Sequence, residues 1–175
     1  DLKPKLVIVE QASENPVRAA AEKLSIPVVE AVVPNNAAAG LFDLFDKTSD
    51  ILIPGETAEA LVLHTSGTTS RPKVVPLTQA NIVASAENIA QTLKLSTSDH
   101  SLNIMPLFHI HGLIAVLSAS ISSGASVCCS SGFNALRFFD LASDERITWY
   151  SGVPTMHQAI LLRGQRHADK AKALK

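Results

Sequence analysis

The stretch Leu61–Ile82, LVLHTSGTTSRPKVVPLTQANI, contains the pattern from which we interpret the rest of the chain. Its apolar start continues the preceding AEA and predicts a buried strand that ends at Thr65. A hydroxyl-rich segment follows directly, and VVPL then predicts a short extended piece. Thr78 is a suitable N-cap for a helix over QANIVASAENIAQTLKL, in which apolar residues recur at helical spacing. The stretch therefore predicts a strand, a polar loop, an extended segment and a helix, in that order.

On both sides of this stretch, short apolar runs alternate with longer segments of helical period. Toward the N-terminus, KLVIVE, SENPVRAAAEKL and IPVVEAVV predict a strand, a helix and a strand, and residues 41–50 have room for one helical turn. Toward the C-terminus we expect strands in SLNIMPL, ASVCCS and ITWYSGV, with helices in HGLIAVLSASISSG, NALRFFDLASD and PTMHQAILLRG. The expected fold is α/β and layered, with a mostly parallel sheet and helices on both faces. Ligands of such sheets bind at the carboxyl ends of strands, so we expect a site in the loops after Thr65, Leu107 and Ser151.

The composition of the chain indicates a globular protein, with 175 residues, 46% hydrophobic and 18% charged. A net charge of -1 favours neither nucleic acid nor an anionic membrane as a partner. No apolar run reaches the ~20 residues of a transmembrane segment. Cys128 and Cys129 are adjacent in an apolar run, which favours two reduced thiols in a core strand and an intracellular location. The start at Asp1, without methionine or a signal peptide, predicts that the chain begins inside a longer protein.

Hydroxyl side chains gather in the loop after the strand that ends at Thr65. They belong to Thr65, Ser66, Thr68, Thr69 and Ser70, with Gly67 among them. Backbone N–H groups and hydroxyls in such a loop can bind phosphate, and Lys73 adds a positive charge. The loop is not a Walker-type P-loop, because it contains one glycine and Val74 follows Lys73. A polar turn whose hydroxyls cap local backbone groups is the alternative, and the residues alone leave both interpretations open.

The segment HTSGTTSRPK, residues 64–73, is similar to the phosphate-binding signature of the adenylate-forming acyl-CoA synthetases, also called AMP-dependent synthetases or ligases. The signature residues present are Thr65, Ser66, Gly67, Thr68, Thr69, Pro72 and Lys73. The chain departs from the signature at Ser70 and Val74, where the family usually has glycine. Serine at the first of these positions resembles the branch of oxalate–CoA ligases and related peroxisomal CoA synthetases. MPLFHIHGL and WYSGVPTMHQAIL resemble two later family motifs, so the resemblance covers residues 1–165 and implies part of the family's large N-terminal domain.

The resemblance also implies roles for single residues. The phosphates of ATP would be bound by Thr65, Ser66, Gly67, Thr68, Thr69, Ser70 and Lys73. Lys73 and His109 would be the catalytic residues, and His109 would face the carboxylate substrate. His111 could pack at a helix start, and the two histidines could share a metal only with further ligands, for which no motif exists, so we predict no metal site. We interpret His157 as a partly buried structural histidine.

The reaction that the resemblance implies is an acid–thiol ligation in two steps. A small carboxylate, such as oxalate, attacks the α-phosphate of ATP to give an acyl-adenylate and pyrophosphate, and the thiol of coenzyme A then displaces AMP. ATP, Mg²⁺ and coenzyme A are thus implied, in a cytoplasmic or peroxisomal location. The family's later motifs are absent, so we expect residues 1–175 to be one fragment of the ATP- and acyl-binding domain, inactive alone and without the C-terminal domain. The alternatives are a medium- or long-chain fatty acyl-CoA synthetase and a non-catalytic nucleotide-binding module.

Overall fold

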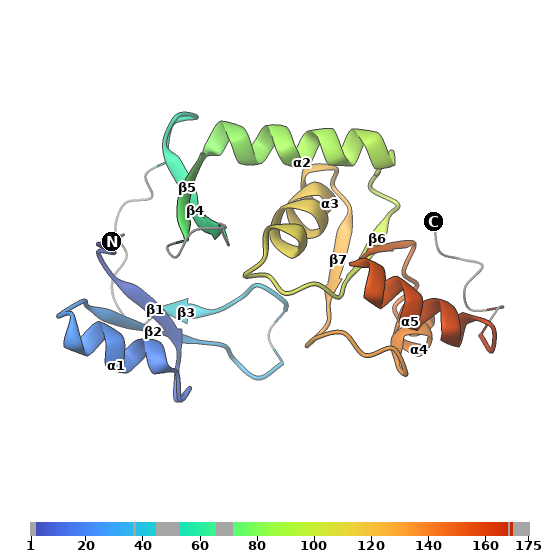
Figure 1. Cartoon of the computed structure of the whole chain (residues 1–175), viewed down its shortest axis with the longest axis horizontal. Helices are drawn as coiled ribbons and strands as arrows, with labels where there is room; N and C mark the ends of the chain where they lie inside the picture. The colour runs from blue at the N-terminus through green and yellow to red at the C-terminus, as the bar shows by residue number, and fades with distance from the viewer. Residues whose placement is uncertain (1–2, 37, 45–52, 66–71, 168, 170–175) are drawn as a thin grey trace. The chain divides into compact units, whose positions relative to one another are not determined.

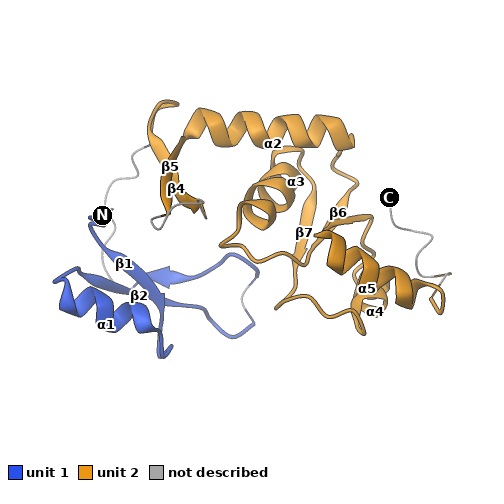
Figure 2. Cartoon of the chain, viewed as in Figure 1, with its two compact units in different colours: residues 1–53 blue, residues 54–175 orange. Residues whose placement is uncertain are grey.

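The structure is a computed structural model, and it describes residues 3–36, 38–44, 53–65, 72–167 and 169. The chain forms two compact units, Asp1–Ile53 and Pro54–Lys175 (Figure 2). Strands and helices alternate along both units (Figure 1), which confirms the α/β fold class.

The first unit is a strand–helix–strand motif with a short third strand. β1 (Val7–Glu10) and β2 (Val28–Val32) pair in parallel, and α1 (Pro16–Lys23) connects them, as the sequence predicts. β3 (Asp43–Leu44) pairs antiparallel with β2. The helical turn expected over residues 41–50 is therefore wrong for the part that the structure describes, because pairing with a neighbouring strand prevails over a weak local pattern.

The second unit begins with a hairpin and a long helix. β4 (Glu59–Thr65) and β5 (Lys73–Thr78) pair antiparallel, and α2 (Gln79–Leu93) follows. The expected mostly parallel sheet does not extend to these two strands. The reason is the length of their connection, residues 66–72, since a crossover between parallel strands needs about a dozen residues or more.

The helix starts use the residues that the sequence suggests. Thr78 caps α2 in a reciprocal arrangement, in which its side chain accepts from the Asn81 N–H and the Asn81 side chain accepts from the Thr78 N–H. The Asn15 side chain caps α1, and Pro16 occupies the first turn of that helix. Pro154 likewise begins the helix Pro154–Gly164, where its missing N–H carries no cost.

A parallel sheet of order β7-β6-β8 forms the rest of the second unit. Its elements are β6 (His100–Asn103), η1 (His111–Ser118, π-helical), α3 (Ala119–Ser122), β7 (Ser126–Cys129), α4 (Phe138–Asp144), β8 (Trp149–Ser151) and α5 (Pro154–Gly164). The register places Asn103, the last residue of β6, opposite both Cys129 and Ser151. The carboxyl ends of the three strands therefore meet at one edge of the sheet, where the sequence predicts a site.

Helices pack on both faces of this sheet, as expected. On one face Leu102 is fully buried in a cluster with residues of α4 and α5, among them Phe138 and Ile160. On the other face the buried Ser101 hydroxyl lies 3.0 Å from the Ser120 hydroxyl of α3. Because adjacent strand residues point to opposite faces, one short strand contacts both helical layers.

The two cysteines differ from the expected pair of core thiols. Both are free, but only Cys128 packs against the apolar cluster, while Cys129 is exposed. The core interpretation is thus wrong for Cys129, because the two side chains leave an outer strand of the sheet in opposite directions.

Candidate functional site

The loop end of the β4–β5 hairpin contains two of the predicted phosphate-binding residues. Thr65 and Lys73 lie directly opposite each other in the antiparallel register, and both are exposed. Opposed residues share one face of a hairpin, so the two side chains leave the same face of it. The other predicted residues of this loop lie outside the described residues: Ser66, Gly67, Thr68, Thr69 and Ser70. The hairpin thus places a hydroxyl donor and a positive charge at the two points where that connection leaves the strands.

Val74, one of the two departures from the family signature, occupies a regular strand position. Val74 lies within β5 and pairs with His64 of β4, and its φ is not positive. Valine is therefore compatible with the backbone at this position, because extended geometry needs no glycine. Ser70, the other departure, lies outside the described residues.

His109 lies in the loop between β6 and η1, and its side chain is exposed. Its backbone is fixed on both sides, since its N–H donates to the Pro106 carbonyl at 3.1 Å and its carbonyl accepts from the Leu113 N–H at 3.0 Å. This combination of a held backbone and an exposed imidazole suits a residue that contacts a ligand. Lys73 begins β5 and His109 follows β6, so the two predicted catalytic residues lie on different elements of the second unit.

His111 does more than pack at a helix start. Its Nε2 lies 2.7 Å from the hydroxyl oxygen of Ser151, at the end of β8. Burial lowers the pKa of the half-buried His111 below its ordinary value of 6.5, and the nearby His109 and His157 lower it further. The imidazole is consequently neutral near pH 7, and one of its nitrogens can accept while the other donates.

A buried asparagine joins the end of β6 to the start of η1. The Asn103 side chain donates to the Gly112 carbonyl at 3.1 Å and accepts from the Met105 N–H at 3.2 Å. A Cβ atom at Gly112 would lie 2.5 Å from the Pro106 carbonyl oxygen, so glycine is required for the loop to close. Sequence reasoning missed Asn103, Gly112 and Ser151, although an amide at the end of an apolar strand was a signal that could have found the first.

His157 holds the turn between β8 and α5. Its Nδ1 lies 3.1 Å from the Tyr150 hydroxyl, and its Nε2 lies 3.0 Å from the Gly152 carbonyl oxygen. The side chain is exposed, so the expected partial burial is wrong, whereas the structural role is consistent with these two bonds. The reason is that His157 lies on the first turn of α5, at the rim of the unit's apolar cluster.

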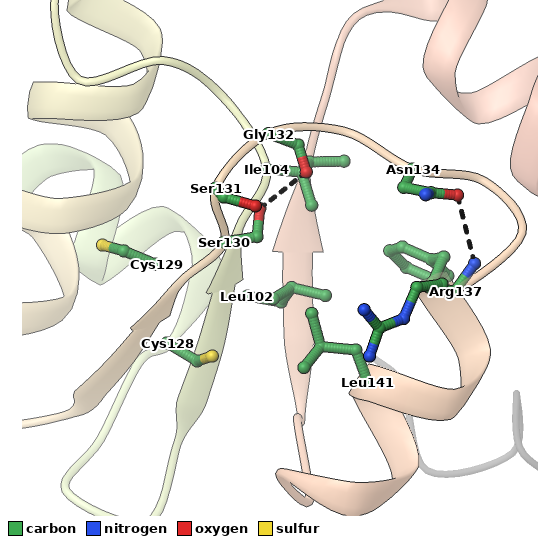
Figure 3. A pocket seen from close by; sticks show the side chains of 11 residues that line it. Leu102, Ile104, Cys128, Cys129, Ser130, Ser131, Gly132, Asn134, Arg137 and Leu141 are labelled. Carbon is green, nitrogen blue, oxygen red and sulfur yellow. Dashed lines mark hydrogen bonds between the residues drawn. The ribbon is translucent and has the colours of Figure 1, made fainter.

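A separate pocket of about 270 Å³ opens between β7 and α4, and the sequence does not predict it. Figure 3 shows Leu102 and Leu141 at its apolar side and Arg137 beside them at the start of α4. The segment after β7 closes its other end, where the Ser130 hydroxyl donates to the Gly132 carbonyl at 3.1 Å. An apolar wall with one guanidinium can accept a small amphipathic molecule, but neither His109 nor His111 lines this pocket.

No three side chains of the metal-binding types, histidine, cysteine, aspartate and glutamate, come together as a cluster in the described part of the chain. No described helix has the length and apolar character that crossing a bilayer requires.

Comparison with known proteins identifies a family. The family model described as AMP-binding enzyme matches residues 1–175. A curated relative, the oxalate–CoA ligase of Arabidopsis thaliana, is 39% identical over 97% of this chain, which spans 34% of that protein. The sulfoacetate–CoA ligase of Cupriavidus necator is 35% identical over 76% of the chain, equal to 26% of that protein.

Solved structures show the same fold. The chain superposes on a crystal structure of MatB from Rhodopseudomonas palustris, with ATP bound, with a TM-score of 0.77. The match has 22% sequence identity and covers 98% of this chain and 34% of that chain. The curated relatives named above are likewise about three times as long as the chain or longer.

Proposed function

This chain belongs to the AMP-binding enzyme family, and from that premise we propose that the whole protein is an ATP-dependent carboxylate–CoA ligase. The reaction converts carboxylate, ATP and coenzyme A to acyl-CoA, AMP and pyrophosphate through an acyl-adenylate. One observation carries the proposal, namely that Thr65 and Lys73 face each other at the two ends of a hydroxyl-rich connection. A hydroxyl and an ammonium group beside backbone N–H groups are the donors that a departing pyrophosphate requires.

The roles of the predicted residues follow from their chemistry. Lys73 and the hydroxyl loop, residues 65–70, stabilise the charge that develops on the leaving phosphates. His109 donates a hydrogen bond from its exposed imidazole to a carboxylate oxygen of the acid and orients the other oxygen for attack. Mg²⁺, when bound, would neutralise part of the phosphate charge.

We propose that the acid is small and has a second anionic group. The support comes from two relatives whose names state their acids, oxalate and sulfoacetate. Each of these acids has two anionic groups on a two-carbon frame, so we expect the site to favour a short, doubly charged acid over one with a long alkyl chain. Comparing kcat/KM for oxalate, sulfoacetate, octanoate and palmitate in the full-length protein tests this, and a preference for the fatty acids would support the alternative of a fatty acyl-CoA synthetase.

The phosphate role of Lys73 is tested by single-turnover formation of the acyl-adenylate. Lys73→Ala should slow this step by about 100-fold, because removing one charged donor from a developing anion has an effect of that order. Lys23→Ala, at an exposed position on α1, is the matched control and should leave the rate unchanged. An unchanged rate in Lys73→Ala would contradict the phosphate role, and ATP binding without turnover in the wild type would favour a non-catalytic nucleotide-binding module.

Two further proposals concern the chain and its location. We propose that residues 1–175 are part of the ATP- and acyl-binding domain and lack ligase activity alone, since the chain spans 34% of its Arabidopsis relative. Exchange of labelled pyrophosphate into ATP by this chain, at the rate of the full-length protein, would refute the second point. We also propose a cytoplasmic or peroxisomal location, consistent with the free thiols of Cys128 and Cys129 and testable by imaging a tagged full-length protein.

A further inference from the structure

Two histidines from different elements hold the end of β8. His111, the first residue of η1, contacts the Ser151 hydroxyl at 2.7 Å. His157, on the first turn of α5, contacts the residues on either side, Tyr150 and Gly152, at 3.1 Å and 3.0 Å. The backbone of Ser151 is fixed as well, because it pairs with Asn103 in the sheet. The backbone of Ser151 is therefore held in the sheet, and its hydroxyl ties the His111 ring to the end of β8.

The same bond affects the loop that contains His109. The loop is attached to β6 through the hydrogen bond between Asn103 and the Gly112 carbonyl, and to β8 through His111. His109 is two residues from His111, and its carbonyl accepts from Leu113 in the first turn of η1. A shift of His111 toward or away from β8 would move this turn and, with it, the exposed imidazole of His109.

We propose that His111 is a positioning residue for adenylation, which acts through Ser151 to set the distance between the His109 loop and the β8–α5 turn. The proposal rests on the proposed function, since it assumes that the carboxylate is bound by the loops at this edge of the sheet. His111 itself touches neither the acid nor ATP in this scheme. Its role requires a ring nitrogen in reach of a hydroxyl, and it does not require a positive charge.

The chemistry of the bond suggests which variants separate positioning from packing. Glutamine at position 111 can place an amide nitrogen or oxygen near the location of Nε2 and restore a neutral hydrogen bond to Ser151. Phenylalanine fills the ring volume without any donor or acceptor. Ser151→Ala removes the partner and leaves the histidine in place. If His111 acts through Ser151, the double variant should be no worse than either single variant.

The experiment measures adenylation by the full-length protein with separate titrations of carboxylate and ATP. We expect His111→Phe and Ser151→Ala each to lower kcat/KM for the carboxylate by about tenfold, with the KM for ATP within about twofold of wild type. His111→Gln should recover activity to within about threefold of wild type. His100→Gln, a histidine at the opposite end of β6, is the control and should behave as wild type.

Losses that multiply in the double variant, a matching rise in the KM for ATP, or no rescue by glutamine would overturn the positioning role. If His111→Phe does not fold, Ser151→Ala and His111→Gln still decide the question, because full activity in Ser151→Ala would also overturn it. A wild-type protein that adenylates no carboxylate would overturn the proposed function, and the inference with it, whereas an active wild type with unaffected variants overturns the inference alone.

Discussion

The substitution Gly112→Ala should displace the loop that contains His109. A Cβ atom at this position would lie 2.5 Å from the Pro106 carbonyl oxygen and 2.8 Å from the Met105 carbonyl oxygen. Ordinary contact begins at 3.4 Å, so the backbone must move by about 0.9 Å (3.4 − 2.5). Both neighbours are backbone atoms, which cannot rotate away as the end of a flexible side chain can. Gly112 is absent from the glycines with positive φ, so the contact alone causes the effect.

The size of the effect follows from that displacement. Forcing a methyl group into a filled space costs about 1–3 kcal/mol of unfolding free energy, which lowers Tm by several degrees. A misplacement of about 1 Å at a catalytic group can reduce the rate by about 100-fold. We therefore expect kcat/KM for the carboxylate to fall by about 10- to 100-fold in full-length Gly112→Ala, with a smaller change in ATP binding.

A matched glycine gives the control for this measurement. A Cβ atom at Gly55 meets nothing within 4 Å, and its φ is not positive, so Gly55→Ala should retain wild-type Tm and activity. Thermal unfolding and steady-state kinetics on the two variants in parallel then separate a local clash from a general effect of replacing glycine. A Gly112→Ala protein with wild-type Tm and wild-type kcat/KM would refute the reasoning about the closed loop.

Three further predictions concern stability and reactivity. Thr148→Val removes a hydroxyl that donates to the buried carboxylate of Asp99 at 3.0 Å, and should lower the unfolding free energy measured in denaturant by about 1–3 kcal/mol, whereas an unchanged midpoint would contradict this. The pKa of His111 is lowered in the folded protein, so the unfolded chain binds more protons as the pH falls below 6.5. The stability that the neutral His111 contributes is therefore present above pH 6.5 and is lost below that value. Tm should drop less on acidification in His111→Gln than in wild type, and equal drops in the two proteins would contradict this. Burial, with the nearby Glu145 and Cys129, raises the pKa of Cys128, so iodoacetamide should alkylate the exposed Cys129 first, and equal rates by peptide mass spectrometry would count against this.

Local patterns predicted the elements well, and contacts between distant segments account for what they missed. Thr78 and Pro154 mark helix starts through their own chemistry, so the sequence alone was enough to place them. The direction of β5 depends on the length of a connection, and β3 depends on a strand elsewhere in the chain. The bond from His111 to Ser151 joins residues that are 40 positions apart, so no local pattern contains it. The predicted phosphate-binding residues were suggested by a resemblance, and Thr65 and Lys73 are those that the structure describes.

Two buried polar residues of β6 determine how the helix that follows this strand packs against the sheet. Ser101 and Asn103 are both buried, yet apolar residues of similar volume would contribute as much or more to stability. Apolar contacts have little direction, so they would allow η1 to slide along the strand. The Asn103 amide instead donates to one carbonyl and accepts from one N–H, and a shift of a single residue would leave both of these groups without a partner. Alternate residues of β6 thus have different roles. Leu102 packs in the apolar cluster on one face of the sheet, while Ser101 and Asn103 on the other face fix the register of the helix that follows the His109 loop.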